Sequence, residues 1–272
     1  MGTGYVFDPA WQAEHARLRA LENLFDPATI HYLAGLGVGP GWRCLDVGGG
    51  AGSIARWLAR QVAPVGQVVA TDVDTRFLDD QGADNLEVRR HDITCDPLEA
   101  EAFDLAHERV VLMYLPQREQ GMARMVEAVR PGGWVVAEAI HVDADLAQAL
   151  RAYTDPPAHA QLLAAVMQAA AALVGAAGAD TALGPRLPRL LHAAGLECIG
   201  GQVHSPLWRG GAEGNFFRLT LEQLADPLTR SGLVSAEDFE RALELSAQPG
   251  LLHVPLVMVT AWGQRPAASD DS

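Results

Sequence analysis

The pattern of apolar and polar positions predicts helices at the start of the chain. Apolar side chains recur at helical spacing over residues 9–24, which predicts a first helix. Asp26-Pro27 has the composition of a helix start and predicts a second helix that runs through Leu36. The glycines of residues 37–41 end this helix. We therefore expect residues 1–39 to form a helical N-terminal cap.

From residue 42 the pattern changes to short apolar runs that alternate with amphipathic segments. The runs predict strands and the segments between them predict helices. The expected strands are residues 42–47, 67–71, 86–89, 103–107 and 134–140, and the expected helices are residues 53–61, 75–81 and 117–130. This alternation indicates an α/β fold with a doubly wound parallel sheet, in which ligands bind at the carboxyl ends of the strands. Residues 40–140 are the expected ligand-binding core.

After residue 140 the alternation stops. The pattern now predicts helices at 143–153, 158–177, 186–194, 220–230 and 235–246, strands at 196–203 and 252–262, and a long loop at 205–218. A glycine-rich joint near residues 175–184 separates the first two of these helices from the rest. We expect residues 141–185 to form a separate helical segment, residues 186–264 to complete the core, and residues 265–272 to be a tail.

The composition excludes several classes of protein. A chain of 272 residues with 49% hydrophobic and 20% charged residues suits a folded protein with a large core. Its formal net charge of −14 repels phosphate backbones, so no nucleic-acid partner is expected. The three cysteines lack CxxC spacing and the nine histidines show no HExxH pattern, so we expect neither disulfides nor a metal site. Because the N-terminus has no signal-peptide pattern and the apolar stretch 152–179 is interrupted, we expect a cytoplasmic protein without a membrane segment.

The sharpest chemical signal lies between the first strand and the helix after it. Gly48, Gly50 and Gly52 alternate within Leu45–Ser53, where glycine permits positive φ and lets a ligand approach the backbone. The N–H groups of the helix start favour a ligand carboxylate or phosphate. The third glycine comes one residue earlier than in the G-x-G-x-x-G turn of dinucleotide-binding folds. A plain tight turn is the alternative.

Two acidic positions follow neighbouring strands. Asp72 ends the second apolar run, and its carboxylate is suited to accept hydrogen bonds from the hydroxyls of a ribose. Asp74 competes for this role, but we interpret it as the N-cap of the next helix. Asp92 follows the third strand and can accept from an exocyclic amine, while Ile93 can pack on a purine. A turn capped by Asp92 explains the spacing equally well.

Five segments in order now resemble the motifs of class I S-adenosylmethionine (SAM)-dependent methyltransferases. They are Leu45–Ser53, Val69–Asp72, His91–Ile93, Phe103–Arg109 with Leu112–Pro116, and Arg130–Trp134. They are similar in particular to bacterial small-molecule methyltransferases of the ubiquinone/menaquinone-biosynthesis type and of natural-product tailoring. Tyr114 stands where the fourth motif often has histidine, so we carry no role onto it.

The resemblance implies a Rossmann-like sheet of seven strands with an antiparallel last strand, and a helical lid insertion at residues 141–185. The implied cofactor is SAM, with S-adenosylhomocysteine (SAH) as its product. The residues implied to bind it are Asp46, Gly48, Gly49, Gly50, Gly52, Asp72, Val73, Asp92, Ile93 and His107.

Methyl transfer requires alignment of the acceptor with the methyl carbon and its sulfur, and a base only where the acceptor must lose a proton. As base, His141 after the fifth strand ranks above His107 at the end of the fourth, and a structural histidine is the alternative for each. Arg109 is a candidate to bind an acidic acceptor or to pair with Glu108. Further candidates for acceptor binding are Tyr5, Trp11 and His159.

The expected function is methylation of a small-molecule acceptor in biosynthetic metabolism. An NAD(P)-dependent oxidoreductase is one alternative, because it also uses a glycine-rich turn followed by an acid. A SAM-binding protein without turnover is a second, and methylation of a protein or nucleic acid is a third. The sequence leaves the oligomeric state open, with a homodimer among the options.

Overall fold

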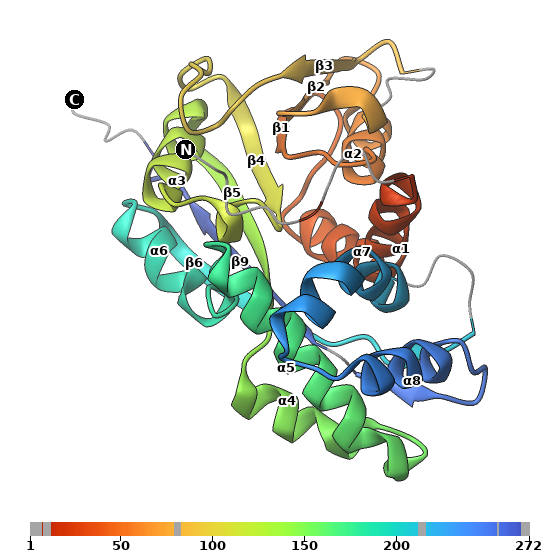
Figure 1. The fold of residues 1–272 in the computed structure, drawn as a ribbon. Coiled ribbons are helices and arrows are strands. Elements are labelled where there is room, and N and C mark those ends of the chain that lie inside the picture. Colours follow the sequence, from red (N-terminus) through yellow and green to blue (C-terminus); the bar gives the residue numbers. More distant parts are fainter. Residues whose placement is uncertain (1–6, 8–11, 79–82, 212–215, 255, 268–272) are drawn as a thin grey trace, which may run out of the picture. The chain divides into compact units, whose positions relative to one another are not determined.

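The computed structural model of the chain describes residues 7, 12–78, 83–211, 216–254 and 256–267. The chain divides into two compact units. Unit 1 comprises residues 1–25, 140–182 and 204–258, and unit 2 comprises residues 26–139, 183–203 and 259–272. Figure 1 shows the elements of both units in the colours of the sequence. Each unit is built from segments that are far apart along the chain.

A seven-stranded sheet of order β3-β2-β1-β4-β5-β9-β6 forms the centre of unit 2. Its strands are β1 (Arg43–Val47), β2 (Gln67–Asp72), β3 (Leu86–Arg90), β4 (Phe103–Arg109), β5 (Val129–His141), β6 (Glu197–His204) and β9 (Val257–Gln264). β1 pairs in parallel with β2 and β4, and the pairs β2–β3 and β4–β5 are also parallel. Arg265, just after β9, exchanges backbone hydrogen bonds with Gly132 and Gly133 near the start of β5, so β9 runs antiparallel. The predicted α/β fold with an antiparallel last strand is confirmed.

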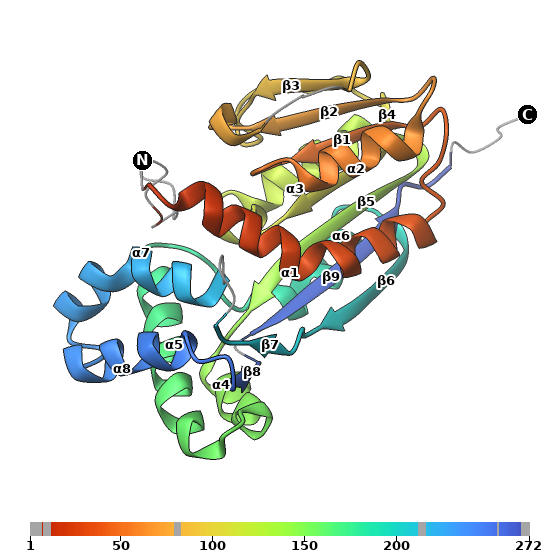
Figure 2. The same cartoon turned by 90° about the vertical axis from the view of Figure 1, so that its right-hand side faces the viewer.

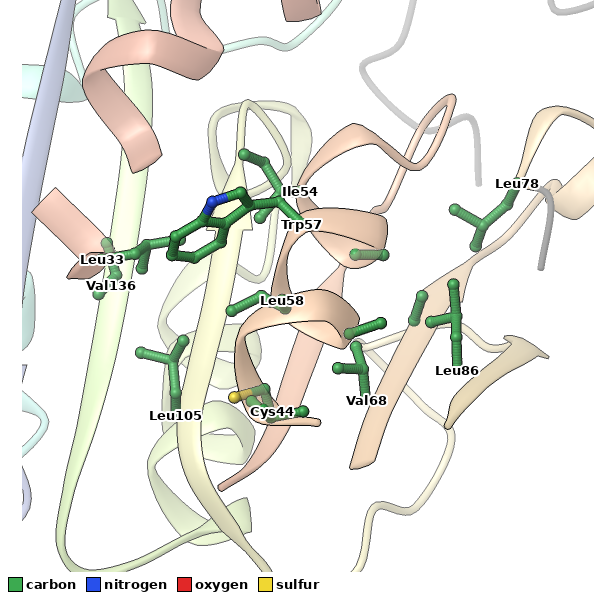
Figure 3. Packing of buried hydrophobic residues seen from close by; sticks show 14 residues of the cluster. Leu33, Cys44, Ile54, Trp57, Leu58, Val68, Leu78, Leu86, Leu105 and Val136 are labelled. Atoms are coloured by element: carbon green, nitrogen blue, oxygen red, sulfur yellow. The ribbon is translucent and has the colours of Figure 1, made fainter. Parts of the chain in front are cut away.

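Helices cover both faces of this sheet (Figure 2). On one face lie α2 (Ser53–Val62) and the C-terminal part of α1 (Glu14–Gly35), and on the other lie α3 (Arg118–Ala128) and α6 (Leu187–Ala193). Leu33 of α1 and Trp57 of α2 belong to one buried cluster with Leu105 of β4 and Val136 of β5 (Figure 3). This apolar packing fixes the N-terminus of α2 at the carboxyl end of β1.

Unit 1 is mainly helical. Its helices are α4 (Ala144–Leu150), α5 (Ala160–Ala176), α7 (Phe216–Ser231) and α8 (Ala236–Ser246), and β7 (Trp208–Arg209) pairs antiparallel with β8 (Leu252–His253). α5 packs against α4, α7 and α8. Among the described residues, the segment 157–176 is long and apolar enough to cross a membrane, a test that the core helix of a soluble protein also passes.

The structure corrects several predicted elements. α1 is one helix through Pro27, because the Asp26 carboxylate bonds to Arg109 and Ser53 instead of capping a new helix. The predicted loop 205–218 contains β7 and the start of α7, and the predicted strand 252–262 is divided into β8 and β9. Of residues 186–264, which we expected to complete the core, residues 204–258 cluster in unit 1 and the rest in unit 2.

Candidate cofactor site

The glycine-rich corner lies between β1 and α2, as the sequence predicts. Gly48, Gly50 and Gly52 have φ values of 69°, 58° and 84°, in the region that favours glycine. The N–H groups of Gly48 and Gly49 donate to the carbonyl of Thr71 at 2.7 and 3.0 Å, which ties the corner to β2. A Cβ atom at Gly48 would overlap Val111, so only glycine fits where these two segments meet.

Asp72 at the end of β2 is bonded to the same corner. Its Oδ2 accepts the N–H of Gly50 at 3.1 Å and its Oδ1 accepts the N–H of Asp74 at 3.1 Å. Burial raises the pKa of the Asp72 carboxyl. The predicted capping role of Asp74 is confirmed, since its carboxylate accepts the N–H of Arg76 at the start of a 3-10 turn, Thr75–Phe77. The two acids therefore have separate roles, and Asp72 is the one at the corner.

The residues after β2 and β3 differ in how much of their side chains is available to contact a ligand. Oδ1 of Asp92 accepts the N–H and the hydroxyl of Thr94 at 2.8 and 2.7 Å, and these bonds lower the pKa of Asp92. Asp92 thus caps the turn, the alternative that the sequence left open. Ile93 is only 4% exposed and faces Gly121 of α3, which leaves little of its side chain for a purine. Val73 is exposed.

His107 lies buried in the sheet between two carboxylates. Its Nδ1 is 2.7 Å from Oδ1 of Asp46 on β1, and its Nε2 is 3.3 Å from Oε2 of Glu138 on β5. Burial alone would lower the pKa of His107, but the two carboxylates outweigh it and raise the pKa to about 9. Both ring nitrogens are therefore occupied, and the ring has no nitrogen left to accept a proton from an acceptor or to contact a cofactor. This geometry corrects the two roles expected for His107.

Glu138 and Arg109 extend this arrangement to α1 and β9. The hydroxyls of Thr29 on α1 and Thr260 on β9 donate to the Glu138 carboxylate at 2.6 and 2.5 Å. Arg109 binds Asp26 of α1 at 2.9 Å. Arg109 thus pairs with α1 and not with Glu108, so the predicted alternative partner was wrong. We call Asp26, Thr29, Asp46, His107, Arg109, Glu138 and Thr260 the buried network.

Glu108 faces the opposite side of β4 and is fully buried. Its Oε2 accepts the N–H groups of Val111 and Leu112 at 2.9 and 3.2 Å, while its Oε1 has no hydrogen-bond partner among the described residues. Burial raises the pKa of the Glu108 carboxyl to about 7. Val110, which lies between Glu108 and these two N–H donors in the sequence, has a φ of 62°, an unfavourable conformation for a branched side chain. Neither Glu108 nor Glu138 has a site role among the sequence-based predictions, although a charged residue within an apolar strand was the available signal.

The remaining predicted acceptor residues lie elsewhere. His141 ends β5 in unit 1, where its Nδ1 is 3.3 Å from the carbonyl of Thr181 and its Nε2 is 3.4 Å from Asp143. His159, also in unit 1, precedes α5. Tyr5 and Trp11 lie outside the described residues. The glycine corner belongs wholly to unit 2. Within the described part of the chain, no cluster of three or more His, Cys, Asp or Glu side chains could hold a metal ion.

Residues 45–137 match the family model described as "Methyltransferase domain". Over 112 residues the chain is 35% identical to the ubiquinone/menaquinone biosynthesis C-methyltransferase UbiE of Cupriavidus taiwanensis, which covers 38% of this chain and 45% of that protein. Over 177 residues it is 29% identical to methyltransferase str2 of Strobilurus tenacellus, covering 64% of this chain and 61% of that protein. The chain thus spans about half the length of the curated relatives it matches.

A solved structure of similar fold is phosphoethanolamine N-methyltransferase 2 of Haemonchus contortus, in complex with phosphomonomethylethanolamine and SAH. Its TM-score is 0.58 at 15% identity, and the match covers 98% of this chain and 61% of that chain. A likeness at this identity concerns the fold, whereas the family model concerns the sequence of the segment that contains the glycine corner, Asp72 and His107. Residues 45–137 are therefore similar in sequence to a methyltransferase domain.

Proposed function

We propose that the chain is an enzyme that transfers a methyl group from SAM to a small-molecule acceptor. The observation that carries the proposal is the carboxylate of Asp72, which lies 3.1 Å from the N–H of Gly50 at the glycine corner. A carboxylate in this place is suited to accept hydrogen bonds from the hydroxyls of an adenosine ribose. The family match over the same segment and the names of the relatives support the same assignment.

The corner fits the amino-acid end of such a cofactor. Added Cβ atoms would overlap Val111 at Gly48 and would lie 2.7 Å from Leu78 at Gly49, so a compact backbone surface exists only because these residues are glycines. Gly52 at the start of α2 has no side chain to cap the helix, whose N–H groups are suited to a carboxylate. Bound SAM would supply an already activated methyl group. The protein's part is then to hold the acceptor in line and to exclude water.

The acceptor and the residues that meet it are further proposals. The net charge of −14 and the small-molecule names of the relatives favour a small acceptor in biosynthetic metabolism. We keep His141 as the candidate base, with His159, Tyr5 and Trp11 as candidates for acceptor binding and the helices of residues 141–185 as a lid. Arg109 is not carried forward as an acceptor-binding residue, because Asp26 and Thr29 occupy its guanidinium.

Calorimetric titration with SAH tests the proposal. Asp72→Ala removes an acceptor of charge-assisted hydrogen bonds, and we expect SAH to bind at least about tenfold more weakly. Asp74→Ala is the matched control, because the Asp74 carboxylate bonds to the backbone and side chain of Arg76 and not to the glycine corner, and its SAH affinity should equal that of the wild type. Equal affinity of wild type and Asp72→Ala would remove the assignment.

Two further results separate the alternatives. Binding of NAD in place of SAH by the wild-type protein would favour an oxidoreductase. If SAH binds, incubation with labelled SAM and a panel of quinone precursors, amines and phenols should yield SAH together with a methylated product. Tight SAH binding without any product across the panel would favour a SAM-binding protein without turnover.

A further inference from the structure

We propose that His107 is a positioning residue, which holds the Asp46 carboxylate so that its second oxygen faces the glycine corner. The proposal rests on the proposed function, because that corner is taken to be the cofactor site. Asp46 is the second residue before Gly48, and its Oδ1 is bonded to His107 at 2.7 Å. Its Oδ2 lies 3.6 Å from the position that a Cβ of Gly49 would take. One oxygen is thus fixed in the interior and the other is directed at the corner.

The fixed geometry needs an imidazolium. Asp46 and Glu138 are both acceptors, so only a ring that carries hydrogen on both nitrogens can donate to both. A neutral ring would turn one lone pair toward a carboxylate that is nine-tenths or more buried. The N–H of the charged ring therefore holds the Asp46 carboxylate in one orientation.

Several elements hold the ring itself. Asp46 and His107 are register partners on the adjacent parallel strands β1 and β4, so both side chains lie on the same face of the sheet. Beyond the ring, Glu138 is fixed by Thr29 of α1 and by Thr260 of β9. The orientation of Asp46 therefore depends on contacts from four other elements. A cationic group of a ligand at the corner, such as an α-ammonium, would meet a carboxylate that is already oriented.

Titration of His107 should consequently change cofactor affinity. The titratable and charged groups that act on the ring, directly or through its partners, are Asp46 of β1, Glu138 of β5, Arg109 and Glu108 of β4, and Asp26 and Tyr32 of α1. The nearest of these, Asp46 and Glu138, accept hydrogen bonds from the ring and favour the imidazolium, and the contact with His107 in turn lowers the pKa of Glu138. Loss of the ring proton near pH 9 would release Asp46.

The test compares the SAH affinity of wild type and His107→Gln by calorimetry from pH 6.5 to 9.5. At pH 7.5 we expect His107→Gln to bind SAH about tenfold more weakly, since glutamine brings no charge. The ratio of the two affinities, in which the titration of SAH itself cancels, should shrink as the pH rises through about 9. His253→Gln is the matched control, because His253 is also buried but lies in unit 1, beside Thr154, and it should bind SAH like the wild type.

A double-mutant cycle separates positioning from general damage to the fold. If His107 acts through Asp46, then Asp46→Asn with His107→Gln should bind SAH no more weakly than the weaker single variant. Independent, additive losses would overturn the proposal, as would wild-type affinity in a folded His107→Gln protein.

Failure of the proposed function and failure of the positioning role of His107 can be told apart. If the wild-type protein does not bind SAH, the proposed function fails by itself. The positioning role then still stands or falls on the ¹⁵N chemical shifts of the His107 ring in the wild-type protein, which require no ligand and no folded variant. A neutral ring at pH 7.5 would overturn it, and an imidazolium that titrates near pH 9 would support it.

Discussion

Neighbouring residues of β4 place buried charges on opposite faces of the sheet. His107 faces Asp46 and Glu138, whereas Glu108 faces the backbone N–H groups of Val111 and Leu112. Alternation of side chains along a strand makes this separation unavoidable once β4 is central in the sheet. The two groups therefore titrate in different surroundings, and each contributes its own pH dependence to stability.

Glu108 should destabilise the protein as the pH rises toward neutrality. Burial raises its pKa from 4.5 to about 7, so the folded state holds a proton that the unfolded state has lost. The stability that comes from this protonated form is fully present below pH 4.5 and is lost as the pH rises through about 7. Glu108→Gln stays neutral and should gain stability relative to wild type between pH 5 and pH 8. Urea unfolding at both values measures the difference, and an unchanged difference would contradict the prediction.

At the scale of elements, the β1–α2 corner depends on glycine more strictly than other turns with positive φ. Gly48 and Gly132 both have positive φ, at 69° and 80°. A Cβ at Gly48 would overlap Val111, whereas a Cβ at Gly132 would meet nothing within 4 Å. The two glycines therefore share a backbone conformation and differ in the room available for a Cβ atom, which makes them a matched pair.

Gly48→Ala should cost clearly more stability than Gly132→Ala. The shared left-handed conformation costs an alanine about 1–2 kcal/mol. Gly48→Ala adds the overlap with Val111 and should also lower SAH affinity, while Gly132→Ala should leave SAH affinity unchanged. Urea unfolding and calorimetry of both variants measure this. Equal losses of stability would mean that the contact with Val111 relaxes without cost.

At the scale of the whole molecule, three of the seven residues of the buried network lie close in sequence to points where the chain passes from one unit to the other. Three of the five points at which the chain crosses from one unit to the other lie between residues 25 and 26, 139 and 140, and 258 and 259. Asp26, Glu138 and Thr260 lie next to these crossings or within two residues of them. Within unit 2, the side chains around His107 thus hold together three segments that lead into unit 1.

Cofactor binding should stabilise unit 2 more than unit 1, because the corner and Asp72 belong to unit 2. SAH at 100 times its dissociation constant would stabilise a unit that binds it by about 2.7 kcal/mol. We expect hydrogen exchange with SAH to slow most at the amides of β1, α2 and β2, and less at those of α8. Equal slowing in α8 would show that the two units unfold as one body.

Features that depend on a few consecutive residues could be predicted from the sequence. The strands of the core, the glycine corner and the cap at Asp74 follow from hydrophobic period and from backbone preferences that neighbouring residues decide. The local pattern wrongly predicted a helix start at Asp26-Pro27, which lies inside α1. Whether Asp26 caps a new helix or lies within a longer one depends on what its carboxylate contacts. The partner that decides it, Arg109, is distant in the chain.

The sequence alone determined the α/β class, the place of the glycine corner and the place of Asp72 at the end of the second strand, because each is encoded within a short segment. Only the tertiary structure decided that His107 lies between Asp46 and Glu138, that Arg109 pairs with α1, and that residues 204–258 belong to unit 1. The physical reason is that the charge and orientation of a buried group depend on partners brought together from distant segments by strand pairing. No local pattern specifies which of those partners will meet.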